Sequence, residues 1–243
     1  MQRLKNMQAT IFSLLLAICV YSNSYSVSPK SLDDYKTHQI HGWQVMVANS
    51  VTKDPQLYNQ LLAQLDKDLN NIVQVMPRWS LPHLRETPIW FEKIMPAPFK
   101  RKLFFNGSKI GSKKYKIEHL YGGVVAGSTQ SYLAVTDIHP WQMLHELTHA
   151  YHQFTIKHAY QPIKVAYKNA SETGLHHYGS QYALRNHKEY FSTLTEAYFG
   201  ITVNYPHNRV ELAEHDPIGY CAIVKAWGLL GEQDANAPLK CQN

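Results

Sequence analysis

The sequence has few cysteines and no long apolar run after its N-terminus. Only three of its 243 residues are cysteine. Cys19 lies in the first apolar run, which leaves Cys221 and Cys241 as a pair without the Cys-x-x-Cys spacing of zinc sites. We therefore predict a disulfide between them, formed in an oxidising compartment. Because no later stretch approaches the roughly 20 apolar residues that span a bilayer, we predict no membrane segment in the mature chain.

Internal repeats, low-complexity tracts and nucleic-acid-binding motifs are also absent from the sequence. A repeat architecture is therefore excluded. The formal net charge is +6, and much of the surplus lies in the lysine-rich run between Lys100 and Lys116. Such a run can attract an acidic substrate or nucleic acid, but with no accompanying motif a solvated loop is the better interpretation. We expect no nucleic-acid partner.

The first 26 residues have the pattern of an export signal. Arg3 and Lys5 precede an apolar run over 11–21, and a small polar stretch over 22–26 follows. An apolar run of this length is too short for a membrane span but suits the central region of a signal peptide. We predict that 1–26 is removed and that the mature protein is secreted or periplasmic.

The remaining chain divides into a turn-rich linker over 27–41 and one domain over 42–243. Residue periodicity predicts strands near 42–51, 88–94 and 131–136, helices near 54–77, 143–153, 186–203 and 218–230, and no clear element over 95–123 or 160–179. Strands fall mainly in the first half of the domain and helices in the second. This distribution predicts an α+β fold with a cleft between the two parts.

The most specific motif is His-Glu-x-x-His, at His145, Glu146 and His149. Residues i and i+4 of a helix share a face, so both imidazoles can reach one metal ion at roughly 2.0–2.1 Å, the zinc–nitrogen distance. Leu144 and Leu147 belong to an apolar stripe that predicts a buried helix. Glu146 stands beside the first ligand and can act as general base toward a metal-bound water. The motif predicts a catalytic Zn²⁺ site.

A catalytic zinc site needs a third protein ligand and an open position. His152 lies three residues past His149 on the same helix and would point away from the metal. An acid on a second helix is the better candidate, and Glu189 and Glu196, seven residues apart, can both face the motif helix. Glu189 can instead bond back to a helix cap at Asn186. Glu196 can instead accept a hydrogen bond from a ligand histidine.

Several segments carry a family resemblance together. They are His-Glu-Leu-Thr-His-Ala-Tyr-His at 145–152, Tyr-Ala-Leu-Arg-Asn-His-Lys-Glu-Tyr-Phe at 182–191 and Thr-Glu-Ala-Tyr-Phe-Gly at 195–200, with further matches through Tyr205-Pro206 and 209–212 to 215–220. This layout resembles the zinc metallopeptidases related to the anthrax lethal factor catalytic domain. It is also similar to an uncharacterised family of secreted proteins. The resemblance covers most of the C-terminal half and is weaker before it.

The resemblance implies a zincin-like fold of the gluzincin type, in which a small mixed sheet and an active-site helix pack against a helical C-terminal part. It implies zinc ligation by His145, His149 and Glu189, with Glu146 as the base and Tyr182 as a catalytic tyrosine. A phenol there can donate to the developing oxyanion or protonate the leaving amine; a packed loop tyrosine is the alternative. Ser192 departs from the family pattern, which leads us to expect a second glutamate there.

These observations predict a zinc-dependent peptidase acting on a peptide or protein substrate. A zinc-binding scaffold without catalytic activity is one alternative, and a zinc hydrolase of a non-peptide amide or ester is another. The predicted strand at 131–136, directly before the motif helix, can pair with an extended substrate backbone. An ordinary core or edge strand is equally compatible with that segment.

Overall fold

The computed structural model describes residues 30–100, 102–176, 181–232 and 237–242. The predicted signal segment lies outside the described residues. Within them the chain combines one mixed sheet with a set of helices, which confirms the α+β prediction. No helix in the described part of the chain is long and apolar enough to cross a membrane.

The sheet has five strands in the order β1-β2-β3-β5-β4. Their bounds are β1 Tyr35–Ile40, β2 Trp43–Ala48, β3 Ile89–Phe91, β4 Leu103–Phe105 and β5 Val124–Ala126. The pairs β2·β3 and β3·β5 are parallel, whereas β1·β2 and β4·β5 are antiparallel. All residues of β3 and β5 are buried, as expected for parallel strands covered on both faces. In the strand order, the antiparallel strand β4 forms one edge of the sheet.

Strand β1 corrects the linker predicted over 27–41. Residues 35–40 pair with β2 from Tyr35 opposite Ala48 to Ile40 opposite Trp43. The two residues between the strands, His41 and Gly42, have φ angles of 48° and 91°. Positive φ at both central positions is the geometry of the tight turns that match strand twist in a hairpin. The strand is not evident in the sequence because most of its side chains are polar and half are exposed, so it lacks apolar alternation.

The helices account for most of the remaining chain. They are α1 Asn49–Thr52, α2 Pro55–Val75, α3 Leu81–Arg85, α4 Lys109–Tyr115, α5 Thr129–Val135, α6 Gln142–Phe154, α7 Gln161–Thr173, α8 His187–Phe199, α9 Arg209–His215 and α10 Pro217–Ala226, with short 3₁₀ turns η1 Leu32–Asp34, η2 Glu118–Leu120, η3 Ala183–Arg185 and η4 Leu230–Glu232. The helices predicted near 54–77, 143–153, 186–203 and 218–230 are confirmed as α2, α6, α8 and α10. Helix α7 occupies 161–173, and β4, α4 and η2 occupy part of 95–123, where no clear element was expected.

The strand predicted at 131–136 is wrong, because this segment lies in helix α5. The Ser128 side chain caps the helix by accepting a hydrogen bond from the Ser131 amide. On the buried face, the Tyr132 hydroxyl donates to Asp68 of α2, and the Tyr132 ring packs edge-on against Phe91 at 5.1 Å between centroids. The cap and these tertiary contacts outweigh the strand preference of a short tyrosine- and valine-containing segment.

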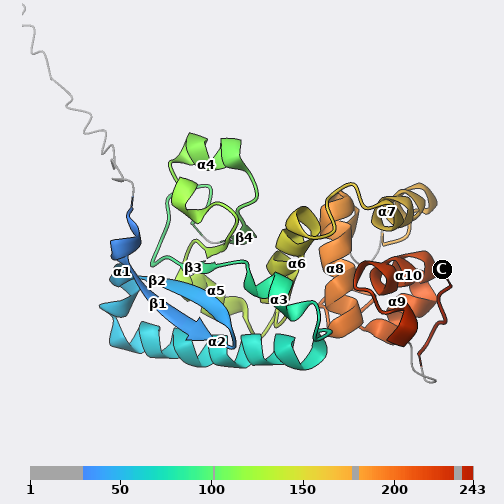
Figure 1. Ribbon diagram of the computed structural model, residues 1–243, viewed down its shortest axis with the longest axis horizontal. Coiled ribbons are helices and arrows are strands. Elements are labelled where there is room, and N and C mark those ends of the chain that lie inside the picture. The colour runs from blue at the N-terminus through green and yellow to red at the C-terminus, as the bar shows by residue number, and fades with distance from the viewer. Residues whose placement is uncertain (1–29, 101, 177–180, 233–236, 243) are drawn as a thin grey trace, which may run out of the picture.

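Helix α6 joins the two parts of the molecule (Figure 1). It packs against β4 and α3 on one side and against α8 on the other. On the helical side, Tyr151 of α6 stacks on the fully buried Trp227 at 4.2 Å between ring centroids, and Phe191 of α8 stacks on the same indole. Residues far apart in the chain therefore fix how α6 and α8 face each other.

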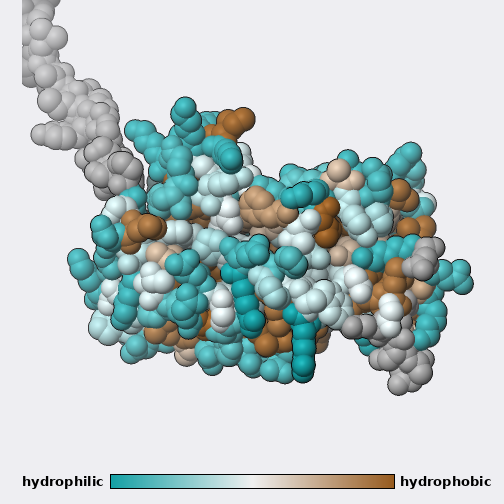
Figure 2. Space-filling view, viewed as in Figure 1, coloured by the Kyte–Doolittle hydropathy of each residue, from teal (hydrophilic) through white to brown (hydrophobic). Residues whose placement is uncertain are grey.

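The C-terminal tail is held by the predicted disulfide between Cys221 of α10 and Cys241, whose Cα atoms are 5.4 Å apart. The pair closes a loop with a sequence separation of 20 residues. On the face shown in Figure 2, hydrophilic and weakly apolar residues prevail, and the strongly hydrophobic patches are small and separated. A cleft lined by residues of β4, α6 and α8 lies between the two parts of the molecule.

Candidate metal centre

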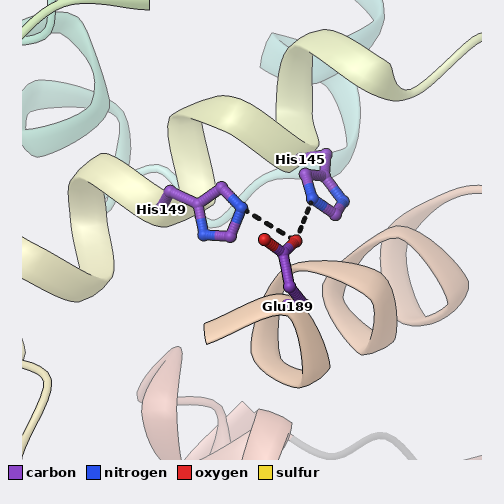
Figure 3. A group of neighbouring side chains, drawn as sticks. All are labelled: His145, His149 and Glu189. Carbon is purple, nitrogen blue, oxygen red and sulfur yellow. Dashed lines mark hydrogen bonds and ion pairs between the residues drawn. The ribbon is translucent and has the colours of Figure 1, made fainter. Parts of the chain in front are cut away.

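His145, His149 and Glu189 converge between α6 and α8 (Figure 3). The Nε2 atoms of the two histidines lie 3.1 and 3.2 Å from one carboxylate oxygen of Glu189. One potential ligand atom from each of the three residues lies within 4.8 Å of the other two, so the group can hold a metal ion. Among the residues that the structure describes, no other histidine, cysteine, aspartate or glutamate group meets this criterion.

The helix cap of α8 leaves Glu189 free to face the histidines. The Asn186 side chain accepts hydrogen bonds from the amides of Lys188 and Glu189, at 2.9 and 3.1 Å. Asn186 thus caps the helix with its own side chain. The Glu189 carboxylate is directed at His145 and His149, so the capping alternative for Glu189 does not describe this structure.

Two further residues of α8 orient the imidazoles. Glu196 contacts Nδ1 of His145, and the Ser192 hydroxyl lies 3.1 Å from Nδ1 of His149. An acceptor at Nδ1 fixes the ring and leaves Nε2 with its lone pair toward the metal position. The geometry confirms the predicted contact of Glu196 with a histidine of the motif. The role of Ser192 was missed, although Glu189, Ser192 and Glu196 have the spacing of residues on one helix face.

Glu146 lies in the same cleft but binds the sheet instead of the histidine–glutamate group. Its Oε2 accepts a hydrogen bond of 2.8 Å from the backbone amide of Phe105 in the edge strand β4. Burial raises the pKa of Glu146 above its usual range, and the nearby His149 and His145 partly oppose this shift. A carboxylate with a raised pKa that is not occupied as a ligand is suited to accept and return a proton.

The electrostatics of the three converging residues favour a cation between them. Burial alone would raise the pKa of Glu189, but hydrogen bonds from His145 and His149 outweigh it and hold the pKa well below the usual range. Burial likewise opposes the charged form of His145, yet the charge of Glu196 and the hydrogen bonds with Glu189 and Glu196 raise its pKa well above 6.5. A bound metal ion would supply positive charge at the same place.

Tyr182 is brought to the site by the turn η3. Its ring centroid is 5.9 Å from that of His145, and the Arg185 guanidinium lies 4.3 Å above the tyrosine ring. Burial, together with the negative charges of Glu189 and Glu146, raises the pKa of Tyr182 above its usual value. The phenol is therefore neutral at physiological pH and can donate a hydrogen bond into the cleft.

The cleft over these residues has a volume of about 640 Å³. Its walls come from β4, the first turns of α6, the turn η3, one face of α8 and the loop after α8. The lining residues are Lys102, Leu103, Phe104, Phe105, His139, Gln142, His145, Glu146, His149, Tyr182, Arg185, Glu189, Thr193, Glu196, Thr202, Val203 and Asn204. All five predicted site residues therefore line one cavity.

His152 lies outside this cavity, as its position on α6 predicted. Its ring is fully buried and contacts the rings of Phe191 and His158, each at 4.9 Å between centroids, and of His187 at 5.6 Å. Burial, with the nearby histidines, lowers the pKa of His152 to about 3. It is a neutral packing residue in this environment.

Comparison of the chain with protein-family models, curated proteins and solved structures found no match. The resemblance to metallopeptidases related to anthrax lethal factor therefore stays a prediction. The donor set can be judged on its own chemistry. Two imidazoles and one carboxylate are a ligand set that zinc takes in catalytic sites, and both imidazoles have the Nδ1 contact that such ligands usually make.

Proposed function

We propose that the protein is a zinc-dependent peptidase with a zincin-like catalytic domain of the gluzincin type. The observation that carries the proposal is the position of Glu146. It lies next to His145 and His149 in an open cleft, it is not one of the three converging residues, and its carboxylate is held by a backbone amide. A structural metal site needs no such group, whereas hydrolysis by activated water needs a base beside the metal.

The residues divide the chemistry among them. His145, His149 and Glu189 would hold Zn²⁺, which when bound lowers the pKa of a water ligand toward about 7 and polarises a carbonyl. Glu146 takes the proton from the attacking water and delivers it to the leaving amine. Tyr182, kept neutral, donates a hydrogen bond to the oxyanion that develops on the substrate carbonyl. Glu196 and Ser192 keep the imidazoles oriented.

The edge strand β4 favours a peptide over a small amide or ester. The Gly127 amide donates to the carbonyl of Lys102, and the Asn106 amide donates to the carbonyl of Gly123, each at 2.8 Å. In an antiparallel pair the backbone N–H and C=O groups of successive residues point alternately toward and away from the partner strand. Since Lys102 and Asn106 are bonded to the β5 side, the backbone groups of Leu103 point to the open edge. An extended substrate can pair there, directly beside Glu146. Pairing with an extended substrate, which the sequence suggested for 131–136, thus fits β4 instead.

The disulfide between Cys221 and Cys241 supports an extracytoplasmic location. We therefore expect the peptidase to act outside the cytoplasm, as a secreted or periplasmic protein. Its substrates would then be peptides or proteins of that compartment.

The test is cleavage of a diverse peptide mixture by purified protein loaded with zinc, followed by mass spectrometry. Cleavage that is lost on chelation and restored by zinc supports the proposal. A folded protein that holds one zinc ion per chain but cleaves no peptide would contradict it. A parallel panel of small amides and esters then separates a non-peptide hydrolase from a zinc-binding scaffold, which should turn over neither set.

A further inference from the structure

The acidic side chains that line the cleft are all engaged by other groups of the protein. Glu146 binds the Phe105 amide, Glu189 lies against both imidazoles, and Glu196 binds Nδ1 of His145. No other aspartate or glutamate is among the described residues that line this cavity. The cleft therefore offers no uncommitted carboxylate to pair with a cationic side chain of a bound peptide.

Two cationic side chains line the same cleft without an acidic partner. Lys102 directly precedes β4, and Arg185 ends η3, so they belong to different walls. Among the described residues, neither has a carboxylate within 4.0 Å; Arg185 stacks on Tyr182, and the Lys102 ammonium makes no hydrogen bond, ion pair or ring contact. Both side chains are exposed and can meet a ligand.

The charge balance of the cleft favours an anion. A divalent ion would leave the three carboxylates, if all are ionised, with one net negative charge. Lys102 and Arg185 add two positive charges and make the whole net positive. Lys102 belongs to the lysine-rich run between Lys100 and Lys116.

From this arrangement we propose that the cleft selects peptides that carry a carboxylate in the segment bound across the metal site, with Lys102 and Arg185 as the selecting residues. The inference rests on the proposed peptidase function. A carboxylate can come from an aspartate or glutamate side chain or from the free C-terminus of the peptide. Both sources offer the same chemistry to an ammonium or a guanidinium group.

Binding and cleavage are measured separately to test the selectivity. The zinc-loaded Glu146→Gln variant is titrated with four labelled peptides that share one common sequence. The four peptides differ in two features: one internal position is either Asp or Asn, and the C-terminus is either free or amidated. The same titrations are repeated with Lys102→Glu added, and with Lys113→Glu as the matched control, because Lys113 is an exposed lysine of the same run that does not line the cleft.

The expected result is a lower Kd for a carboxylate-bearing peptide than for its neutral counterpart, by about fivefold at low salt, the upper end for one exposed ion pair. The preference should shrink as salt is raised. Lys102→Glu should remove or reverse it, while Lys113→Glu leaves it unchanged. The pair of peptides that shows the preference identifies the carboxylate. Tighter binding of the Asp peptide than of the Asn peptide indicates a side-chain carboxylate, and tighter binding of the free than of the amidated peptide indicates the C-terminus.

Equal Kd values for all four peptides, or equal loss of the preference in both lysine variants, would overturn the selectivity. The wild-type protein is assayed in parallel for cleavage of the same peptides. Cleavage without a carboxylate preference contradicts only the selectivity. A binding preference without any cleavage contradicts the proposed peptidase activity and leaves the selective cleft standing. Arg185→Gln gives a second variant, although its contact with Tyr182 means that only binding is compared.

Discussion

Helix α6 carries histidines in two contrasting environments. His145 faces carboxylates of α8, which raise its pKa despite its burial. His152, two turns further along, faces His158, His187 and an aromatic ring, and its pKa falls to about 3. The helix supplies the same residue type in both places. The contrast shows that the acids of the neighbouring helix, and not the histidines alone, create a place for a cation.

Removing Glu189, the acid that faces both histidines of the motif, should have the largest effect. Glu189→Ala leaves two imidazoles with no negatively charged partner for the ion, so we expect zinc content to fall from one ion per chain to a small fraction. The measurement is metal analysis after dialysis, with circular dichroism to confirm folding. Glu172→Ala, at an exposed position of α7, is the matched control and should retain zinc. Full retention of zinc in Glu189→Ala would remove this residue from the ligand set.

A smaller effect is expected from the residues that orient the imidazoles. Glu196→Gln keeps a hydrogen-bond acceptor near His145 but removes its charge, and mutation of such a partner typically weakens metal affinity by about 10- to 100-fold. Ser192→Ala removes only the neutral acceptor of His149 and should cost less. Competition with a chromogenic chelator gives both affinities. The reverse order of the two variants would show that the charge of the Glu196 carboxylate is not what strengthens metal binding.

The smallest effect on the metal is expected at His152. His152→Leu should keep full zinc content, because this ring lies outside the metal cleft. Its effect should appear in the pH dependence of stability. The pKa of His152 is depressed in the folded state, so below about pH 6.5 the unfolded chain binds more protons and the folded state loses stability as pH falls toward 3.

Chemical unfolding between pH 4 and 7 measures this difference. The decline in the free energy of unfolding on acidification should be shallower in His152→Leu than in the wild type. Near neutral pH the free energy of unfolding should depend on pH in the same way in both proteins. Identical slopes for the two proteins over this range would show that His152 does not titrate as a buried neutral residue. Loss of zinc in the variant would show that the two histidine environments are not independent.

The sequence predicted the convergence of His145, His149 and Glu189 better than it predicted the opposite wall of the cleft. The spacing of His145 and His149 and the periodicity of the two helices are local features, so they could be recognised without the fold. The contact between Glu146 and Phe105 joins positions 41 residues apart through a three-residue strand in a segment without clear periodicity. No local pattern encodes such a contact. Strand β1, with exposed polar side chains, was hidden for a related reason.

Ser192 illustrates a different limit. Its spacing from Glu189 and Glu196 puts it on the same face of α8, but the family resemblance implies a glutamate at this position. The hydroxyl meets His149 at 3.1 Å, which only the packing of α8 on α6 determines. Periodicity therefore identified the face, whereas the partner of each side chain depended on how the helices approach each other.

The most direct test of the proposed function compares the wild type with Glu146→Gln in one experiment that measures both zinc content and peptide cleavage. We predict one zinc ion per chain in both proteins. We also predict cleavage by the wild type and a kcat lower by about 10²- to 10⁴-fold in the variant, the range attributed to a general base. Equal cleavage by both proteins, or loss of zinc from the variant, would contradict the proposed separation of metal binding from proton transfer.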